Sequence, residues 1–191
     1  MRLKSALRRG VAAAVIAGVV VSSGIPAYAG TWDIANGDIT VKGASDESGN
    51  YNKVKQGDKD FEKDEGETVI TGESDKNTVT IDTSGGKVDV TFDDLKIDAS
   101  DKGKAAVRVE GGHDATIELD GDNKLKSGSH NAGLEKNGNE SSGKLTIKDD
   151  NDTKGSLTAK GGEGGGAGIG GGIKSTGSSI TIRGGTIKAV G

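Results

Sequence analysis

Three clusters of aspartates recur along the sequence and have the residue type that a hard metal ion prefers. Closely spaced carboxylates repel one another unless water or a cation screens them, and Ca²⁺ takes six to eight oxygen ligands. We therefore predict a calcium-binding ridge, with calcium as the cofactor. The alternative is a set of turns whose aspartates bond their own backbone, because no complete calcium-loop spacing is present. The predicted ligands are Asp93 and Asp94, Asp120 and Asp122, and Asp149, Asp150 and Asp152.

Aromatic side chains are the second candidate for chemistry, because the apolar face of a sugar ring packs on a flat aromatic ring. Beyond residue 29 the chain has only four aromatic residues, and Trp32 and Tyr51 are the two that we predict to bind a ligand. Trp32 directly precedes the alternating run "DITV" and has a second interpretation, as part of a cap on the fold. Tyr51 lies in the polar segment "ESGNYNKVKQGDKD".

Catalytic motifs are missing from the sequence. His113 and His130 stand alone in "GGHDA" and "GSHNA", and neither G-x-S-x-G nor H-E-x-x-H occurs. Carboxylates are plentiful, so their presence does not distinguish a glycoside hydrolase or a polysaccharide lyase from a binding protein. We expect that the protein is not an enzyme, with those two activities as alternatives.

Short runs in which apolar and polar residues alternate predict the β-strands that must position these residues. The first run of each unit begins at residues 88, 117, 145 and 180, so the spacings are 29, 28 and 35 residues. A second run follows each aspartate corner, and a third run, such as 79–81 or 132–134, lies between units. Three strands per unit of about 30 residues, with no helix between them, are typical of a β-solenoid whose aspartate corners stack. The alternatives are an antiparallel sandwich, and disorder caused by the low apolar content.

The glycine-rich segment "GGEGGGAGIGGG" at 161–172 fits the same repeat. Ala167 and Ile169 occupy the place of the third run, as Ala132 and Leu134 do one unit earlier. We predict an ordered segment in which glycines serve tight corners and Ile169 points inward. A phosphate-binding loop is excluded because no GK[ST] order follows.

The first 29 residues predict the localisation of the protein. A basic start, an apolar run of about a dozen residues and the small residues Ala27 and Ala29 indicate a signal peptide, so we expect a secreted or cell-surface protein. The apolar run is shorter than the roughly 20 residues that span a bilayer, so no membrane span is expected after cleavage. Cleavage leaves 21 basic against 29 acidic residues, a formal charge of −8 that argues against nucleic acid as a partner. Zero cysteines exclude disulfides and thiolate chemistry.

Several motifs together carry a family resemblance. "WDIANGDITV", "NTVTIDTSGGKVDVTFDDLKIDAS", "DGDNKLKSGSHNAGLE", "GAGIGGG" and "ITIRGGTIKAVG" resemble the carbohydrate-binding domain proteins secreted by Gram-positive bacteria. The resemblance covers residues 31–191. It implies a right-handed parallel β-helix similar to polysaccharide lyases, associated with calcium, that binds cellulose or pectic acid without cleaving it.

These observations give one predicted organisation. Residues 1–29 are the signal peptide, and residues 30–191 are an all-β carbohydrate-binding domain, a right-handed parallel β-helix of about four coils. Within it, 30–66 form an N-terminal strand and capping segment and 67–191 form the coils. The last unit stops at Gly191 in mid-repeat, so we expect a truncated C-terminal end. The expected function is a non-catalytic extracellular polysaccharide-binding or adhesion module, with a structural stalk of a surface protein as the alternative.

Overall fold

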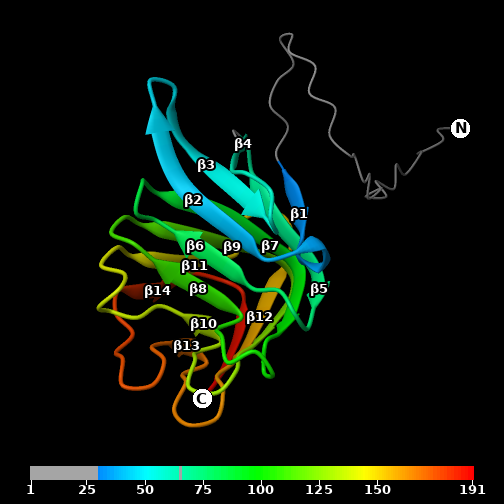
Figure 1. Cartoon of the computed structure of the whole chain (residues 1–191), viewed down its shortest axis with the longest axis vertical. Helices are drawn as coiled ribbons and strands as arrows, with labels where there is room; N and C mark the ends of the chain where they lie inside the picture. Colours follow the sequence, from blue (N-terminus) through cyan, green and yellow to red (C-terminus); the bar gives the residue numbers. More distant parts are fainter. Residues whose placement is uncertain (1–29, 65) are drawn as a thin grey trace, which may run out of the picture.

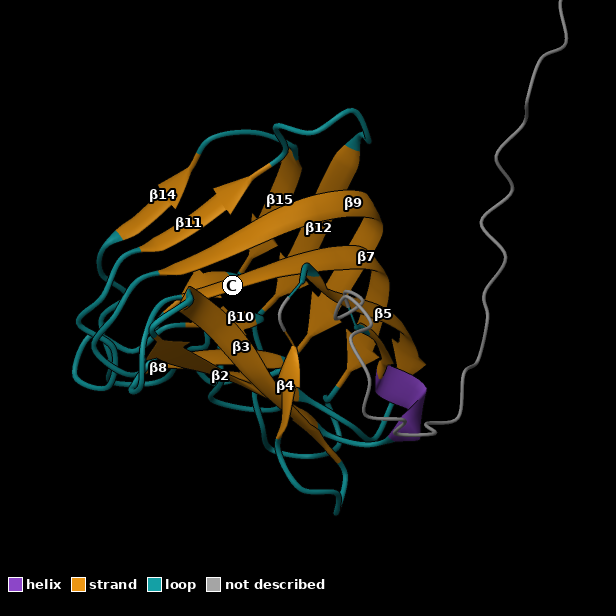
Figure 2. Ribbon diagram, turned by 90° about the horizontal axis from the view of Figure 1, so that it is seen from above, coloured by secondary structure: helices purple, strands orange, loops and turns teal. Residues whose placement is uncertain are grey.

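The computed structural model describes residues 30–64 and 66–191, and the predicted signal peptide lies outside them. The described chain is all-β, apart from the short 3₁₀ helix η1 (Ile34–Asn36). Its strands form two sheets around one hydrophobic core (Figures 1 and 2). The eight-stranded sheet contains β1 (Thr31–Asp33), β5 (Thr68–Ser74), β7 (Val88–Asp98), β9 (Ala115–Lys126), β11 (Leu145–Lys148), β12 (Gly155–Lys160), β14 (Ile180–Ile182) and β15 (Thr186–Val190). The seven-stranded sheet contains β2 (Ile39–Asp46), β3 (Gly49–Gln56), β4 (Glu62–Asp64), β6 (Val79–Asp82), β8 (Val107–Glu110), β10 (Leu134–Glu135) and β13 (Ile169–Gly170).

Parallel pairing between successive units builds the eight-stranded sheet. Val88 pairs with Ala115, Ala115 with Leu145, and Leu145 with Ile180. Inward side chains from this sheet, such as Phe92 and Ile117, are fully buried and share one core with those of the seven-stranded sheet. The predicted repeat of about 30 residues is therefore confirmed as the spacing between paired strands.

The predicted right-handed parallel β-helix of about four coils is wrong. The described strands form two separate sheets instead of a closed solenoid, and the seven-stranded sheet is mixed. In that sheet β2 pairs antiparallel with β3, and β3 pairs antiparallel with β4. The resulting two-layer arrangement resembles a sandwich, although most of its strands run parallel.

The sequence analysis did not predict the hairpin of β2 and β3, because its second strand is polar. Only Val54 of β3 is a buried aliphatic residue, so "GNYNKVKQ" shows no apolar alternation. Backbone pairing with β2 and side-chain hydrogen bonds hold it in place. Its turn is closed by Ser48 N, which donates to Asp46 Oδ1 at 2.8 Å, and Gly49 takes a φ of 121° there.

The register of β7 with β9 and of β9 with β11 differs by two residues from the alignment of the unit starts, whereas β11 and β14 pair as that alignment predicts. Aligning the starts of the units places Glu118 beside Thr146, whereas in the structure Ile117 pairs with Ile147 and Glu118 with Lys148. A slip of two residues keeps every side chain on its own face of the sheet, because side chains alternate with a period of two. The core was therefore predictable, while the outward neighbours were not.

The glycine-rich segment is ordered, as predicted. Ile169 pairs with Leu134 and packs against the core. A Cβ atom on Gly166 would lie 1.9 Å from the carbonyl oxygen of Asn131, so only glycine permits this close approach. The segment is therefore part of the fold.

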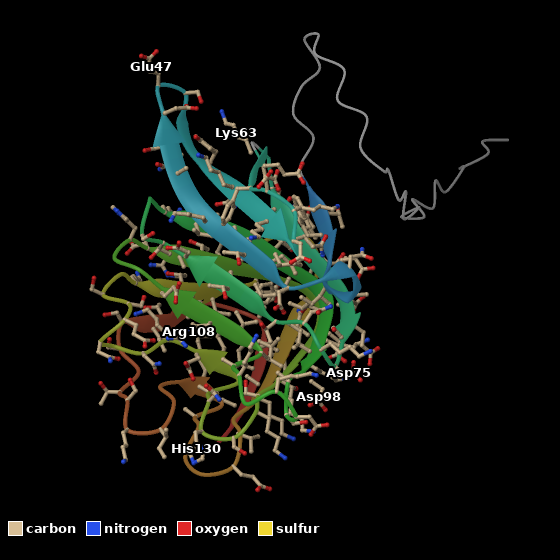
Figure 3. All side chains as sticks on the ribbon, in the orientation of Figure 1. Glu47, Lys63, Asp75, Asp98, Arg108 and His130 are labelled. Atoms are coloured by element: carbon tan, nitrogen blue, oxygen red, sulfur yellow. The ribbon has the colours of Figure 1, made fainter. Side chains whose placement is uncertain are left out.

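The two ends of the sheets are built differently (Figure 1). At one end, Ile34 of η1 is fully buried, and the buried carboxylate of Asp64 accepts hydrogen bonds from Gly30 N and Trp32 Nε1. Figure 3 shows Glu47 at the tip of the hairpin at this end and His130 at the opposite end. In residues 30–64 and 66–191, no helix has the length and apolar character needed to cross a membrane.

Candidate functional site

A groove of about 560 Å³ lies over the outward face of the eight-stranded sheet, next to the end of the hairpin. The segment 50–52, Gly66 and Glu67 border it on one side, and outward positions of β7, β9 and β11 form its floor. Thr91, Glu118 and Lys148 are neighbours in register on these three strands. Each alternates with buried core residues, so the sheet itself fixes where these polar groups stand.

An ion-pair cluster forms one side of the groove. Lys148 Nζ lies 2.7 Å from Glu118 Oε2 and 2.6 Å from Asp150 Oδ1. Asp150 N donates to Glu118 Oε1 at 3.0 Å, which closes the cluster. Hydrogen bonds to Asp150 and Glu118 raise the pKa of the Lys148 ammonium, and the bond from Lys148 lowers the pKa of Asp150. Lys148 and Asp150 are therefore fully charged near neutral pH.

A hydroxyl–carboxylate pair stands beside this cluster. Thr91 Oγ1 donates to Glu67 Oε1 at 2.5 Å. Thr91 is buried and Glu67 is exposed, so the bond fixes a carboxylate at the edge of the groove. Both groups of this pair line the groove.

Tyr51, one of the two predicted ligand-binding aromatics, does line the groove. Its ring is half-buried, and Lys63 Nζ lies over it at 4.2 Å from the ring centroid. Lys63 is also held by Asp46 at 3.0 Å, in a bond that helps to lower the pKa of Asp46 to about 2, after the larger contribution of Ser48. A sugar ring stacking on Tyr51 must therefore use the other ring face or displace the ammonium group.

Trp32, the other predicted aromatic, does not line the groove. It pairs in register with Ile70, packs against the core, and donates from Nε1 to Asp64 Oδ2 at 3.2 Å. These contacts hold Trp32 in edge strand β1, and its second interpretation, as part of a cap, stays a prediction.

The predicted calcium ridge is only partly assembled. Asp93 and Asp120 pair in register on β7 and β9. Burial raises the pKa of Asp93, and the charges of Asp94 and Asp120 raise it further. The third corner contributes an amide to this pair, because Asn151 Nδ2 donates to Asp120 Oδ1 at 2.7 Å.

The other predicted metal ligands have separate positions. Asp94 accepts a hydrogen bond from Asp122 N at 2.9 Å, and Asp122 pairs with Lys124 at 2.6 Å. Asp149 and Asp152 lie in the loop between β11 and β12, and only Asp150 lines the groove. In the part of the chain that the structure describes, no three His, Asp or Glu side chains converge in a way that could hold a metal ion. The calcium site stays a prediction.

The sequence analysis missed Glu67, Thr91, Glu118 and Lys148. For Thr91, Glu118 and Lys148 the available signal was the outward position of each residue within "VDVTF", "IELD" and "LTIK", whereas Glu67 precedes the next strand and belongs to none of these runs. The two-residue slip in the alignment hid the juxtaposition of Glu118 with Lys148, because it placed Glu118 beside Thr146.

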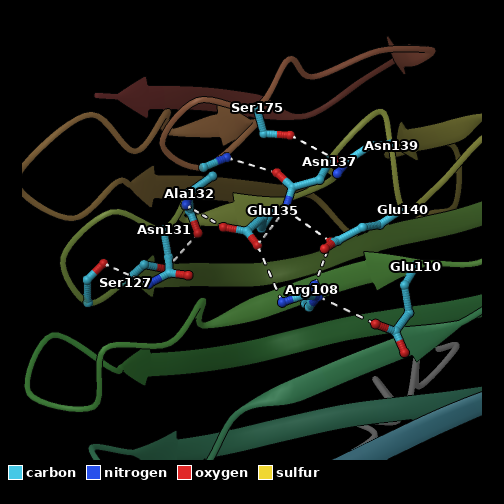
Figure 4. A network of polar contacts seen from close by, with 12 residues as sticks. Arg108, Glu110, Ser127, Asn131, Ala132, Glu135, Asn137, Asn139, Glu140 and Ser175 are labelled. Carbon is cyan, nitrogen blue, oxygen red and sulfur yellow. Dashed lines mark hydrogen bonds and ion pairs between the residues drawn. The ribbon is translucent and has the colours of Figure 1, made fainter.

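A second polar cluster lies on the seven-stranded sheet and is drawn in Figure 4. Arg108 lies 2.5 Å from Glu140 and 3.8 Å from the buried Glu135. Asn137 Nδ2 bridges the two carboxylates, at 3.0 Å from Glu135 and 3.1 Å from Glu140. Glu135 also accepts a hydrogen bond from Ala132 N at 3.0 Å. The members of this Arg108 cluster therefore bind one another, and none of them lines the groove.

The charge of the groove limits its ligands. It has four acidic and two basic side chains, a formal charge of −2, and Lys87 and Asp89 form an exposed pair at 2.9 Å. Fixed carboxylates accept hydrogen bonds from hydroxyl groups, whereas they repel a polyanion unless a cation lies between them. The charged residues are Glu67, Lys87, Asp89, Glu118, Lys148 and Asp150.

Comparison with known proteins gave no match to a protein-family model, a curated protein or a solved structure. The groove and its geometry are therefore the basis for a functional argument.

Proposed function

We propose that the protein is a secreted or cell-surface module that binds a neutral, hydroxyl-rich polysaccharide of the cellulose type in the groove, without cleaving it. The observation that carries the proposal is the groove itself, where Tyr51 stands beside the fixed polar row of Thr91, Glu118 and Lys148. Carbohydrate sites combine an aromatic surface with a few fixed hydrogen-bonding groups. The family resemblance of the sequence supports the same ligand class.

Charge favours a neutral glycan over a pectic one. The groove has a formal charge of −2, so a polyuronate would need a bridging cation to approach it. A calcium ion at Asp150, the one predicted metal ligand that lines the groove, would supply that bridge. Calcium dependence is therefore expected for pectate and not for cellulose.

The ion-pair cluster supports binding over catalysis. A general acid or base works best when its pKa lies near the working pH. Hydrogen bonds to Asp150 and Glu118 raise the pKa of Lys148, and the bond from Lys148 lowers the pKa of Asp150. Neither Lys148 nor Asp150 therefore has a pKa near neutral pH, so neither is suited to act as a general acid or base there.

Affinity electrophoresis tests the proposal. The protein is run through native gels containing soluble cellulose derivatives or pectate, each with calcium or with a chelator. We expect retardation in the cellulose gel under both conditions, and in the pectate gel only with calcium. Unchanged mobility in every gel would contradict the proposal and would favour the structural stalk, and release of soluble sugars would indicate an enzyme.

A further inference from the structure

The groove is part of a longer polar surface on the outward face of the eight-stranded sheet. Its floor crosses the neighbouring strands β7, β9 and β11, and β14 is the next strand beyond β11 (Figure 2). Adjacent strands lie about 4.8 Å apart, so the distance from β7 to β11 is about 10 Å and from β7 to β14 about 14 Å. Along β7 the floor covers two outward positions, Asp89 and Thr91, which are only about 7 Å apart. The groove is therefore longer across the strands than along them.

A row of three threonines continues the floor of the groove past β11. Thr116 of β9 lines the groove and pairs in register with Thr146 of β11, which pairs in turn with Thr181 of β14. All three residues are half-buried and alternate with residues of the core, so their side chains lie on the outward face. We call Thr116, Thr146 and Thr181 the hydroxyl row.

The side chains of the hydroxyl row are available to a ligand. None of the three hydroxyl groups has a hydrogen-bond partner among the residues that the structure describes. By contrast, the hydroxyl groups of Thr68 and Thr91 donate to Asp64 and Glu67. A half-buried hydroxyl group without a protein partner needs water or a ligand to satisfy it. The row therefore offers one unused donor and acceptor on each successive strand.

The polar row of Thr91, Glu118 and Lys148 continues in the same direction. Arg183 follows Ile182, the partner of Ile147, and its N–H donates to the oxygen of Ile147, so Arg183 stands beside Lys148. The hydrogen bond from Lys148 is the main cause of the lowered pKa of Asp150, and the charge of Arg183 lowers this pKa further. The Arg183 side chain is exposed. Two rows of hydrogen-bonding groups thus run from the groove onto β14.

We propose that the two rows form one binding track, on which a single glycan chain lies across the strands from Tyr51 in the groove to Thr181 and Arg183 on β14. The inference rests on the proposed function and adds the direction and the length of the ligand. Each sugar residue extends a β-linked pyranose chain by roughly one strand spacing, so successive sugars meet equivalent groups on successive strands. Both sides of such a chain carry hydroxyl groups, one side for each row. The track therefore fits an extended glycan of about four sugar residues.

NMR titration with two probes of different length tests the track. Cellobiose fits within the groove, whereas cellohexaose is long enough to reach β14. We expect both sugars to shift the amide signal of Tyr51, and only cellohexaose to shift the signals of Thr146 and Thr181. The affinity for cellohexaose should be at least about tenfold higher than that for cellobiose, because it adds hydrogen bonds on β11 and β14.

A double variant, Thr146→Val with Thr181→Val, removes two hydroxyl groups and keeps the β-branched shape of both side chains. It should lower the affinity for cellohexaose about tenfold and leave that for cellobiose unchanged. Thr158→Val is the matched control, because Thr158 is half-buried in β12 of the same sheet but belongs to neither row. Arg183→Ala is the second variant and should weaken cellohexaose binding several-fold.

The outcomes separate the track from the proposed function. Binding of both sugars with equal affinity, or a double variant that binds cellohexaose like the wild type, would overturn the track and leave the groove as a binding site. A loss in Thr158→Val as large as that in the double variant would also overturn the track. If neither sugar binds, the proposed function is contradicted, and the track with it.

Discussion

The groove and the Arg108 cluster show what the same kinds of charged side chain do in two settings. In the Arg108 cluster, one guanidinium and one amide connect Glu135 with Glu140, and the buried Glu135 also bonds the backbone of Ala132. In the groove, Lys148 connects Glu118 with Asp150 at the edge of an open volume of about 560 Å³. Pairing between charged side chains alone therefore does not show which of the two regions binds a ligand.

The difference lies in what remains available to a ligand. Glu135 is 2% exposed and has three partners in the protein, so its role is to hold the chain on both sides of β10 and to join it to β8. The Asp150 side chain is 66% exposed and lines the groove, so it can accept a hydrogen bond from a ligand. We propose a binding role for the groove because its charged side chains border an open volume.

The largest expected effect is a loss of stability in the Arg108 cluster. Glu135→Ala leaves the buried Ala132 N–H without its hydrogen-bond partner, whereas Arg108 keeps Glu110 and Glu140, so we expect the free energy of unfolding to fall by about 2 kcal/mol. Urea denaturation measures it. Glu140→Ala, at an exposed member of the same cluster, should cost less than about 1 kcal/mol. Equal losses in the two variants would show that burial does not set the contribution of this cluster.

A smaller effect, on binding alone, is expected at Tyr51. Tyr51→Ala removes the aromatic surface of the groove, and we expect the affinity for a cellulose-type polysaccharide to fall several-fold, by the roughly 1 kcal/mol typical of an aromatic contact. Affinity electrophoresis measures the change. Phe61→Ala is the control, because Phe61 is an exposed aromatic residue that does not line the groove. A loss of the same size in Phe61→Ala would argue against a specific role for Tyr51.

The smallest effect is expected at Asp93. Its pKa is raised above the ordinary value of 3.8 by burial and by Asp94 and Asp120, so its ionised form destabilises the fold. The penalty is complete above the folded-state pKa and disappears as the pH falls through that pKa toward 3.8. Asp93→Asn should thus raise the melting temperature slightly at pH 7, and the gain should vanish in acid.

Adding calcium to the Asp93→Asn experiment tests the predicted metal site as well. If the aspartate corners bind calcium, adding the ion should raise the melting temperature of the wild-type protein and not that of Asp93→Asn. If the higher melting temperature of Asp93→Asn relative to the wild type persists unchanged at low pH, the electrostatic explanation is contradicted. A wild-type melting temperature that calcium does not change would remove the predicted ridge.

The sequence predicted the parts of the fold that depend on apolar alternation. The strands around Val90, Ile117 and Ile147 and the inward position of Ile169 followed from a period of two and a repeat of about 30 residues. The antiparallel strand β3 did not follow, because backbone pairing and the hydrogen bonds of Asn52 and Gln56 hold it, and these leave no apolar pattern. The β-helix prediction was wrong because it required parallel strands throughout.

The site was less predictable than the core for a related reason. Burial fixes which face a side chain occupies but does not distinguish two registers that differ by two residues. Two of the predicted aspartate corners lie within β7 and β9, where Asp93 pairs with Asp120, and their role as metal ligands stays a prediction. The contact of Glu118 with Lys148 required the true register, which only the three-dimensional structure provides.

The most direct test of the central claim, that the groove and not the Arg108 cluster binds the polysaccharide, compares one variant from each. Wild type, Lys148→Ala and Glu140→Gln are run side by side through gels containing a neutral cellulose derivative. Lys148→Ala removes the ammonium group that orients Glu118 and Asp150, so its affinity should fall about tenfold, the equivalent of one charge-assisted hydrogen bond. Glu140→Gln should be retarded by the polysaccharide as much as the wild type, each relative to its own mobility in a gel without polysaccharide. Equal retardation of Lys148→Ala and wild type, or a loss confined to Glu140→Gln, would contradict the claim.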